Sequence, residues 1–98
     1  MTGTTVSSAD LDPRRRRLLF RAWHRGTREM DLLMGSFADA SLKEMSEDDL
    51  VVFEALCEVP DRDLFAWLTG KEDVASNYDT EIYRRLQAFH THGGPIHV

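Results

Sequence analysis

No run of apolar residues in this 98-residue sequence approaches the roughly 20 that a helix needs to cross a lipid bilayer. Residues 1–13 also lack the basic start and apolar centre of a signal peptide. They contain no arginine and two acids, which argues against a retained organelle-targeting helix. We therefore expect no membrane insertion, and the cytoplasm is the simplest location.

The chain contains a single cysteine, Cys57. A single thiol excludes a disulfide within the chain and fits a reducing compartment. Cys57 falls on the apolar side of an expected helix, where a thiol is usually buried and unreactive. We expect it to pack in the core.

Recognisable catalytic and metal-binding patterns are missing as well. No histidine stands at a metal-binding spacing from the cysteine or from acids, and no segment resembles a nucleophile elbow or a phosphate-binding loop. The histidines are His24, His90, His92 and His97. We therefore expect no catalytic residue, no metal site and no stably bound cofactor.

The composition that remains is that of a small globular protein. Hydrophobic residues make up 42% and charged residues 30% of the chain, and 98 residues suffice for one core. Strand alternation is nowhere sustained, whereas helical spacing recurs. The sequence predicts an all-α protein, a compact bundle of about five short helices in one domain over 12–92, between flexible segments at 1–11 and 93–98.

Capping residues and apolar stripes locate the first three helices. The first extends from Pro13 to about Arg25 with Asp12 as its cap, and Gly26 ends it in a left-handed conformation. Thr27 and Ser46 cap the next two. The expected buried faces are Leu18, Leu19, Ala22 and Trp23, then Met30, Leu33, Met34, Phe37 and Ala38, then Phe53, Leu56 and Cys57.

Two further helices follow in the second half of the chain. Asp61 is the simplest cap for a short helix that Gly70 ends, and a loop continues to residue 77. A fifth helix is expected over 78–90, before the Gly-Gly-Pro run at 93–95. Their expected buried residues are Leu64, Trp67 and Leu68, then Ile82, Leu86 and Phe89.

Charge is distributed unevenly along the chain. Residues 1–28 carry seven arginines and two acids, giving +5, whereas residues 29–98 carry five basic and fifteen acidic residues, giving −10. Four arginines three or four residues apart form a stripe on the first helix: Arg14, Arg17, Arg21 and Arg25. The stripe has three interpretations: a solvated helix face, a nucleic-acid patch, or a surface that binds an acidic protein.

The segment from Arg25 to Glu29 joins the first two helices and reads Arg-Gly-Thr-Arg-Glu. A helix end explains Gly26, because glycine tolerates positive φ. Glu29 fits the start of the next helix, because a negative charge is favourable at a helix N-terminus. A helix junction does not require these particular charged neighbours. We expect Arg25 and Glu29 to be exposed at a corner that a partner can reach.

The R-G-x-x-E pattern of Arg25, Gly26 and Glu29, after a basic helix containing aromatic residues, resembles the succinate dehydrogenase assembly factor 2, or FAD assembly factor, family. The continuation Met30-Asp31-Leu32-Leu33 supports the resemblance. Residues 61–68, Asp-Arg-Asp-Leu-Phe-Ala-Trp-Leu, resemble the family's D-x-D-L-F-x-W-L segment. Order and spacing agree across roughly residues 14–90.

The resemblance implies a chaperone-like helper that is not an enzyme. It implies binding to the flavoprotein subunit of succinate dehydrogenase, and in bacteria also to that of fumarate reductase. It further implies covalent attachment of FAD, through its 8α-methyl carbon, to a histidine of that client. Arg25, Gly26, Glu29 and Asp31 are the expected partner-binding residues. We expect a monomer, located in the bacterial cytoplasm or, in a eukaryote, in the mitochondrial matrix.

Two other functions remain open from the residues alone. One is a nucleic-acid-binding regulator that uses the stripe from Arg14 to Arg25. The acidic remainder of the chain argues against it, because it repels phosphates. The other is a protein-interaction module with a different client.

Overall fold

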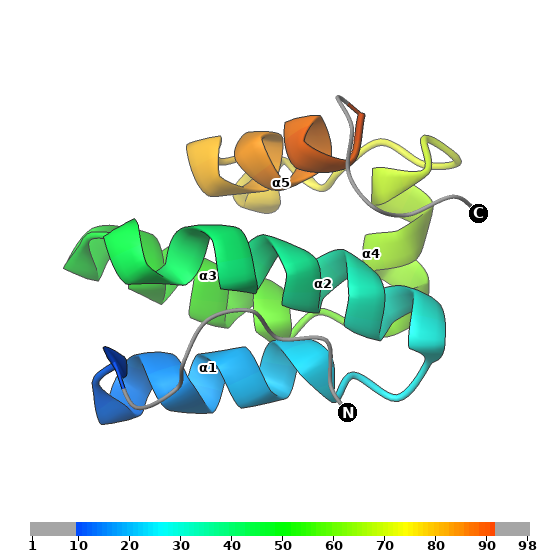
Figure 1. The fold of residues 1–98 in the computed structure, drawn as a ribbon. Coiled ribbons are helices and arrows are strands. Elements are labelled where there is room, and N and C mark those ends of the chain that lie inside the picture. The colour runs from blue at the N-terminus through cyan, green and yellow to red at the C-terminus, as the bar shows by residue number, and fades with distance from the viewer. Residues whose placement is uncertain (1–9, 92–98) are drawn as a thin grey trace.

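The computed structural model describes residues 10–91, and within this range the chain forms α-helices and short 3₁₀ turns without strands (Figure 1). The elements are α1 (Pro13–Trp23), α2 (Arg28–Ser41), η2 (Leu42–Glu44), α3 (Glu47–Cys57), α4 (Asp61–Leu68), η3 (Ser76–Tyr78) and α5 (Glu81–Thr91). The predicted all-α bundle of five helices is confirmed. The expected flexible segments fall mostly outside the described residues, although Leu11 is buried in the core.

The helices pack around one core. α1 and α2 are antiparallel neighbours, α3 packs against α1, and α5 lies against α2 and α3 on the side away from α1 (Figure 1). α4 stands at the end of the bundle where the chain turns from α1 into α2 (Figure 1). This arrangement brings the Arg25–Glu29 corner beside the start of α4.

The predicted apolar stripes form most of the core, and residues outside the expected faces complete it, among them Leu11, Leu42 and Val59. All the expected residues of the first three helices are buried, as are Leu64, Trp67, Ile82 and Leu86. Leu68 and Phe89 are only partly buried against the core. Tyr83, which the spacing does not single out, is only 2% exposed.

Three of the predicted caps are confirmed. The side chains of Asp12, Thr27 and Ser46 each accept a hydrogen bond from the backbone N–H three residues later. Asp49 returns the bond to the backbone N–H of Ser46, which completes a capping box. Each of these contacts lies within one helical turn, which is why a local pattern predicts it.

The expected cap of α4 is wrong. Pro60 occupies the capping position without a side-chain hydrogen bond, and Asp61 is already the first helical residue. The other end agrees with the prediction, because Gly70 has φ +82°. Its N–H donates to the carbonyl of Trp67, and the N–H of Lys71 donates to that of Ala66, the pattern of a Schellman motif.

Two helix boundaries also differ from the sequence expectation. α1 ends at Trp23 rather than near Arg25, because the side chain of Asp31 accepts the backbone N–H of Arg25. α5 begins at Glu81 rather than Tyr78, because Tyr78 belongs to the 3₁₀ turn η3. The hydroxyl of Thr80 then accepts the N–H of Tyr83.

α1 and α2 approach closely where Gly35 faces the indole ring of Trp23. A Cβ atom added to Gly35 would lie 2.2 Å from Cδ2 of Trp23, well inside van der Waals contact. The missing side chain therefore makes room for the ring. This glycine has a packing role that helical spacing does not indicate.

Candidate functional site

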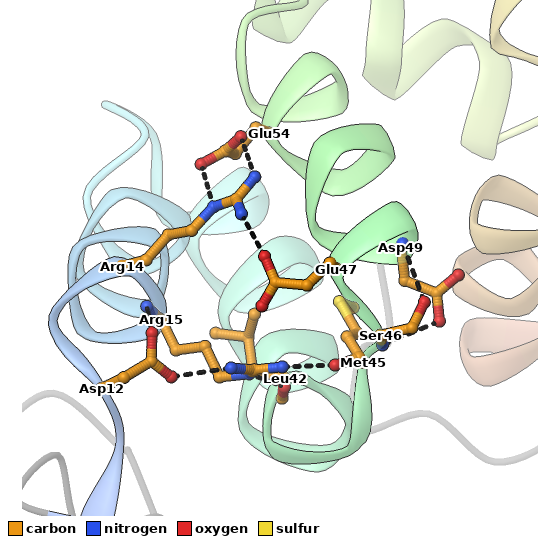
Figure 2. Close-up of polar contacts among 9 residues, drawn as sticks. All are labelled: Asp12, Arg14, Arg15, Leu42, Met45, Ser46, Glu47, Asp49 and Glu54. Atoms are coloured by element: carbon orange, nitrogen blue, oxygen red, sulfur yellow. Dashed lines mark hydrogen bonds and ion pairs between the residues drawn. The ribbon is translucent and has the colours of Figure 1, made fainter.

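Arg14 and Arg15, at the start of α1, are bound to other parts of the protein (Figure 2). Arg14 donates from Nε and Nη2 to the two carboxylate oxygens of Glu54, both at 2.9 Å, and from Nη1 to Glu47 at 2.8 Å. The hydrogen bond from Arg14 lowers the pKa of the Glu54 carboxyl below its usual value. Arg14 thereby joins α1 to α3.

Arg15 makes a second connection beside it. Its guanidinium donates to the backbone carbonyl oxygens of Leu42, at 2.9 Å, and of Met45 (Figure 2). It also pairs with Asp12 at 2.7 Å. These bonds satisfy carbonyl groups at the turn that leads into α3, so Arg15 supports the connection between α2 and α3.

Three of the four arginines of the stripe bind acidic side chains. Arg21 donates to Glu58 at 2.5 Å, and Arg17 alone of the four forms no hydrogen bond or ion pair with the described residues. Arg14 binds Glu47 and Glu54, Arg21 binds Glu58, and Arg25 binds Asp61. The helical spacing of the arginines does not identify these partners, because the acids lie on segments distant along the chain.

Arg25 differs most from the sequence expectation, because its side chain is only 6% exposed. Nε donates to Oδ1 of Asp61 at 2.8 Å, and Nη2 lies 2.7 Å from the same oxygen. Nη1 donates to the carbonyl of Cys57 at 2.6 Å, and Nη2 to that of Val59 at 2.5 Å. Arg25 therefore holds the corner against the connection between α3 and α4, and is not an exposed charge.

Asp31 also acts within the corner. Its Oδ1 accepts the backbone N–H groups of Arg25, at 2.5 Å, and Gly26, at 3.4 Å. Amide groups that follow a helix end otherwise need water or another acceptor. The carboxylate thus stabilises the backbone of the turn from inside the same motif.

Gly26 has the positive φ that the sequence predicts, +125°. Space does not require the glycine, because the nearest atom to an added Cβ would be Oδ2 of Asp61 at 3.9 Å. The backbone conformation does, since side chains other than hydrogen are strained at this φ. The corner is exposed at Gly26.

Glu29 is exposed in the first turn of α2, and no described residue forms a hydrogen bond or an ion pair with its side chain. The four predicted partner-binding residues therefore divide into two pairs. Arg25 and Asp31 build the corner, whereas Gly26 and Glu29 form its surface. Their role toward a partner stays a prediction.

Two grooves flank this corner and share Asp61 as a common wall. The α2–α4 groove, of about 710 Å³, is lined by Thr27, Glu29, Met30, Asp61, Arg62 and Phe65. The α1 groove, of about 470 Å³, is lined by Phe20, Arg21, His24, Arg25, Cys57, Val59, Pro60 and Asp61. Neither groove follows from the sequence, because helices distant along the chain form both.

An exposed aromatic pair borders the α1 groove. Phe20 is 63% exposed, and its ring stacks on His24 with centroids 3.9 Å apart. Nδ1 of His24 lies 2.7 Å from the carbonyl oxygen of Phe20. The helical spacing of the sequence does not mark this pair as a surface feature, and single exposed hydrophobic residues are common on protein surfaces.

The thiol of Cys57 agrees with its predicted packing role. The residue is 8% exposed, and burial raises the pKa of the thiol to about 11. Among the described residues, no three histidine, cysteine or acidic side chains are grouped as metal ligands would be. No helix in the described part of the chain has the length and apolar character needed to cross a membrane.

The sequence matches a known family over most of its length. The model of the family described as the flavinator of succinate dehydrogenase matches residues 16–90. A protein of Acetobacter pasteurianus named FAD assembly factor SdhE is 41% identical over 81 residues, which cover 83% of this chain and 74% of that protein.

Two mitochondrial proteins named succinate dehydrogenase assembly factor 2 are also similar. The one from Dictyostelium discoideum is 33% identical over 79 residues, covering 81% of this chain and 56% of that protein. The one from Caenorhabditis elegans is 33% identical over 92 residues, which cover 91% of this chain and 77% of that protein.

The fold and these relatives define the class of protein, a small all-helical assembly factor. The chain belongs to the family of succinate dehydrogenase flavinators. The resemblance carried by Arg25, Gly26 and Glu29 is thereby confirmed. The expectation of an assembly factor rather than an enzyme agrees with the names of the relatives.

Proposed function

We propose that this protein binds the flavoprotein subunit of succinate dehydrogenase and promotes covalent attachment of FAD to it. The family description and the name of the bacterial relative support this function. The observation that carries it is the corner, where Arg25 and Asp31 are held from within and Gly26 and Glu29 remain at the surface. The flavoprotein subunit of fumarate reductase is proposed as a second client, to which FAD is attached in the same way.

In this proposal the covalent chemistry belongs to the client and its FAD. The bond joins a client histidine to the 8α-methyl carbon of the flavin, and it forms faster when both are held close and aligned. A helper that binds preferentially to the competent arrangement of the client increases its population. Such a helper needs a complementary surface and no catalytic group of its own.

The internal bonding of the corner favours tight binding. Association costs free energy when loops and side chains must be ordered at the interface. The side chain of Arg25 is already ordered in the free protein, because Asp61 and two backbone carbonyls accept its hydrogen bonds. The corner therefore offers a preformed surface.

We further propose that the protein acts as a monomer in the bacterial cytoplasm, or in the mitochondrial matrix of a eukaryote, and that FAD is the cofactor of its client. The nucleic-acid alternative has less support, because carboxylates already engage Arg14, Arg21 and Arg25 and reduce the positive charge that the stripe offers to phosphates.

The experiment is a flavinylation assay with the purified flavoprotein subunit, FAD and this protein. Covalent flavin is read as fluorescence of the denatured client in a gel. The wild-type protein is expected to raise the signal above that of client and FAD alone, and Glu29→Gln to reduce the gain. A cognate client that needs assistance and gains nothing from the wild-type protein would contradict the proposed function.

A further inference from the structure

The α2–α4 groove beside the corner combines an apolar wall with two carboxylates. Met30 and the half-buried Phe65 contribute the apolar part, while Glu29 and Asp61 contribute the acids. These residues come from the first two turns of α2 and α4, and the ion pair between Arg25 and Asp61 holds the start of α4 against the corner that precedes α2. The groove is thus continuous with the surface at Gly26 and Glu29.

Both carboxylates keep acceptor capacity that the protein itself does not use. Glu29 has no hydrogen-bonding or ionic partner among the described residues. Arg25 engages only Oδ1 of Asp61. Oδ2 of Asp61 lies 3.9 Å from the position that a Cβ of Gly26 would take, so the absence of that side chain leaves this oxygen approachable.

The cation that lines the groove does not neutralise these acids. Arg62 is exposed, and within the described residues it pairs with neither Glu29 nor Asp61. Asp61 is already paired with Arg25 through Oδ1. A purely apolar occupant would therefore bury the carboxylate of Glu29 without a partner and Oδ2 of Asp61 without a donor, which costs free energy. A cationic group at the end of an aliphatic chain satisfies both parts of the groove.

We propose that the α2–α4 groove receives a lysine or arginine side chain of the client flavoprotein subunit. Its aliphatic part lies over Met30 and Phe65, and its cationic end lies between Glu29 and Oδ2 of Asp61. This inference rests on the proposed function and names the contact that it uses. It also gives Gly26 a second role, because a side chain there would stand between the partner and Asp61.

The test compares the affinity of the full chain and its variants for the purified flavoprotein subunit by titration calorimetry. Glu29→Gln removes the charge and keeps the shape, so we expect affinity to fall at least about tenfold at low salt, with a weaker salt dependence. Arg62→Gln removes a repulsive cation, and we expect affinity to rise several-fold. Phe65→Ala should weaken binding as well.

Glu72→Gln is the matched control, because Glu72 is exposed and lines neither groove. Melting curves identify any variant that is less stable. If Phe65→Ala unfolds, the variants at the exposed residues Glu29 and Arg62 still test the proposal. Unchanged affinity in Glu29→Gln, or weaker binding in Arg62→Gln, would overturn the cationic occupant. A wild-type protein that does not bind the subunit would instead reject the proposed function.

Discussion

Arg25 and Asp61 form an ion pair between residues 36 positions apart, with Nε of the arginine 2.8 Å from Oδ1 of the acid. Arg25 opens the R-G-x-x-E pattern, and Asp61 opens the D-x-D-L-F-x-W-L segment. The two motifs that carry the family resemblance are therefore one structural unit. This pair joins the two motifs in the folded chain.

Arg25→Ala is expected to destabilise the protein by about 2–4 kcal/mol. The substitution leaves the carboxylate of Asp61 and two backbone carbonyls without their donor. An exposed Arg25, as the sequence predicts it, would instead give little change in stability. Urea denaturation gives the free energy of unfolding, and the exposed Glu29→Ala should stay within about 0.5 kcal/mol of the wild type.

Gly35→Ala is expected to destabilise the protein, although alanine normally stabilises a helix interior by about 1 kcal/mol relative to glycine. The added methyl would lie 2.2 Å from the ring of Trp23, and overpacking typically costs about 1–3 kcal/mol. Trp23→Leu in the same chain should relieve part of this penalty. Thermal unfolding of both single variants and the double variant measures the coupling, and additive effects would refute the contact.

Gly26→Val is expected to cost on the order of 1 kcal/mol or more, because valine is strained at φ +125°. Gly70→Val gives a similar strain at φ +82°, with nothing within 4 Å of an added Cβ. Both variants should melt earlier than the wild type. Only Gly26→Val should also reduce covalent flavin in the client, and equal flavinylation by both would argue against the corner as the binding surface.

Acid is expected to destabilise the protein through His90. Its Nε2 lies 2.7 Å from the carbonyl of Leu33, Nδ1 is buried without a partner among the described residues, and burial lowers the pKa of the ring. The unfolded chain therefore binds the proton more readily. The stabilisation is present above the unfolded pKa of about 6.5 and is lost as the pH falls from there toward the lower folded pKa.

The measurement is the free energy of unfolding of the wild type and of His90→Gln between about pH 7.5 and pH 5. This interval spans the pH range over which histidine side chains usually gain a proton. The variant is expected to lose less stability than the wild type over this interval. Other groups titrate in both proteins, so the difference between the two curves isolates His90. Parallel curves would show that the ring is protonated equally in the folded and unfolded states.

Local chemistry made much of the fold predictable from the sequence. Asp12, Thr27 and Ser46 cap their helices through the N–H three residues later, and a helical period of apolar residues selects the face that is buried. Such interactions depend on neighbours within a turn or two. The sequence alone therefore determined the five helices, most of the core, the positive φ of Gly26 and the family.

The tertiary structure decided which side chains the site exposes. Asp61 binds Arg25 instead of capping α4, Arg14 binds acids 33 and 40 residues away, and Gly35 makes room for Trp23. A buried guanidinium binds whichever acceptors the packed helices place around it, and helical spacing does not specify them. For this reason the motif residues were found from the sequence, whereas the division between the buried Arg25 and the exposed Glu29 required the folded chain.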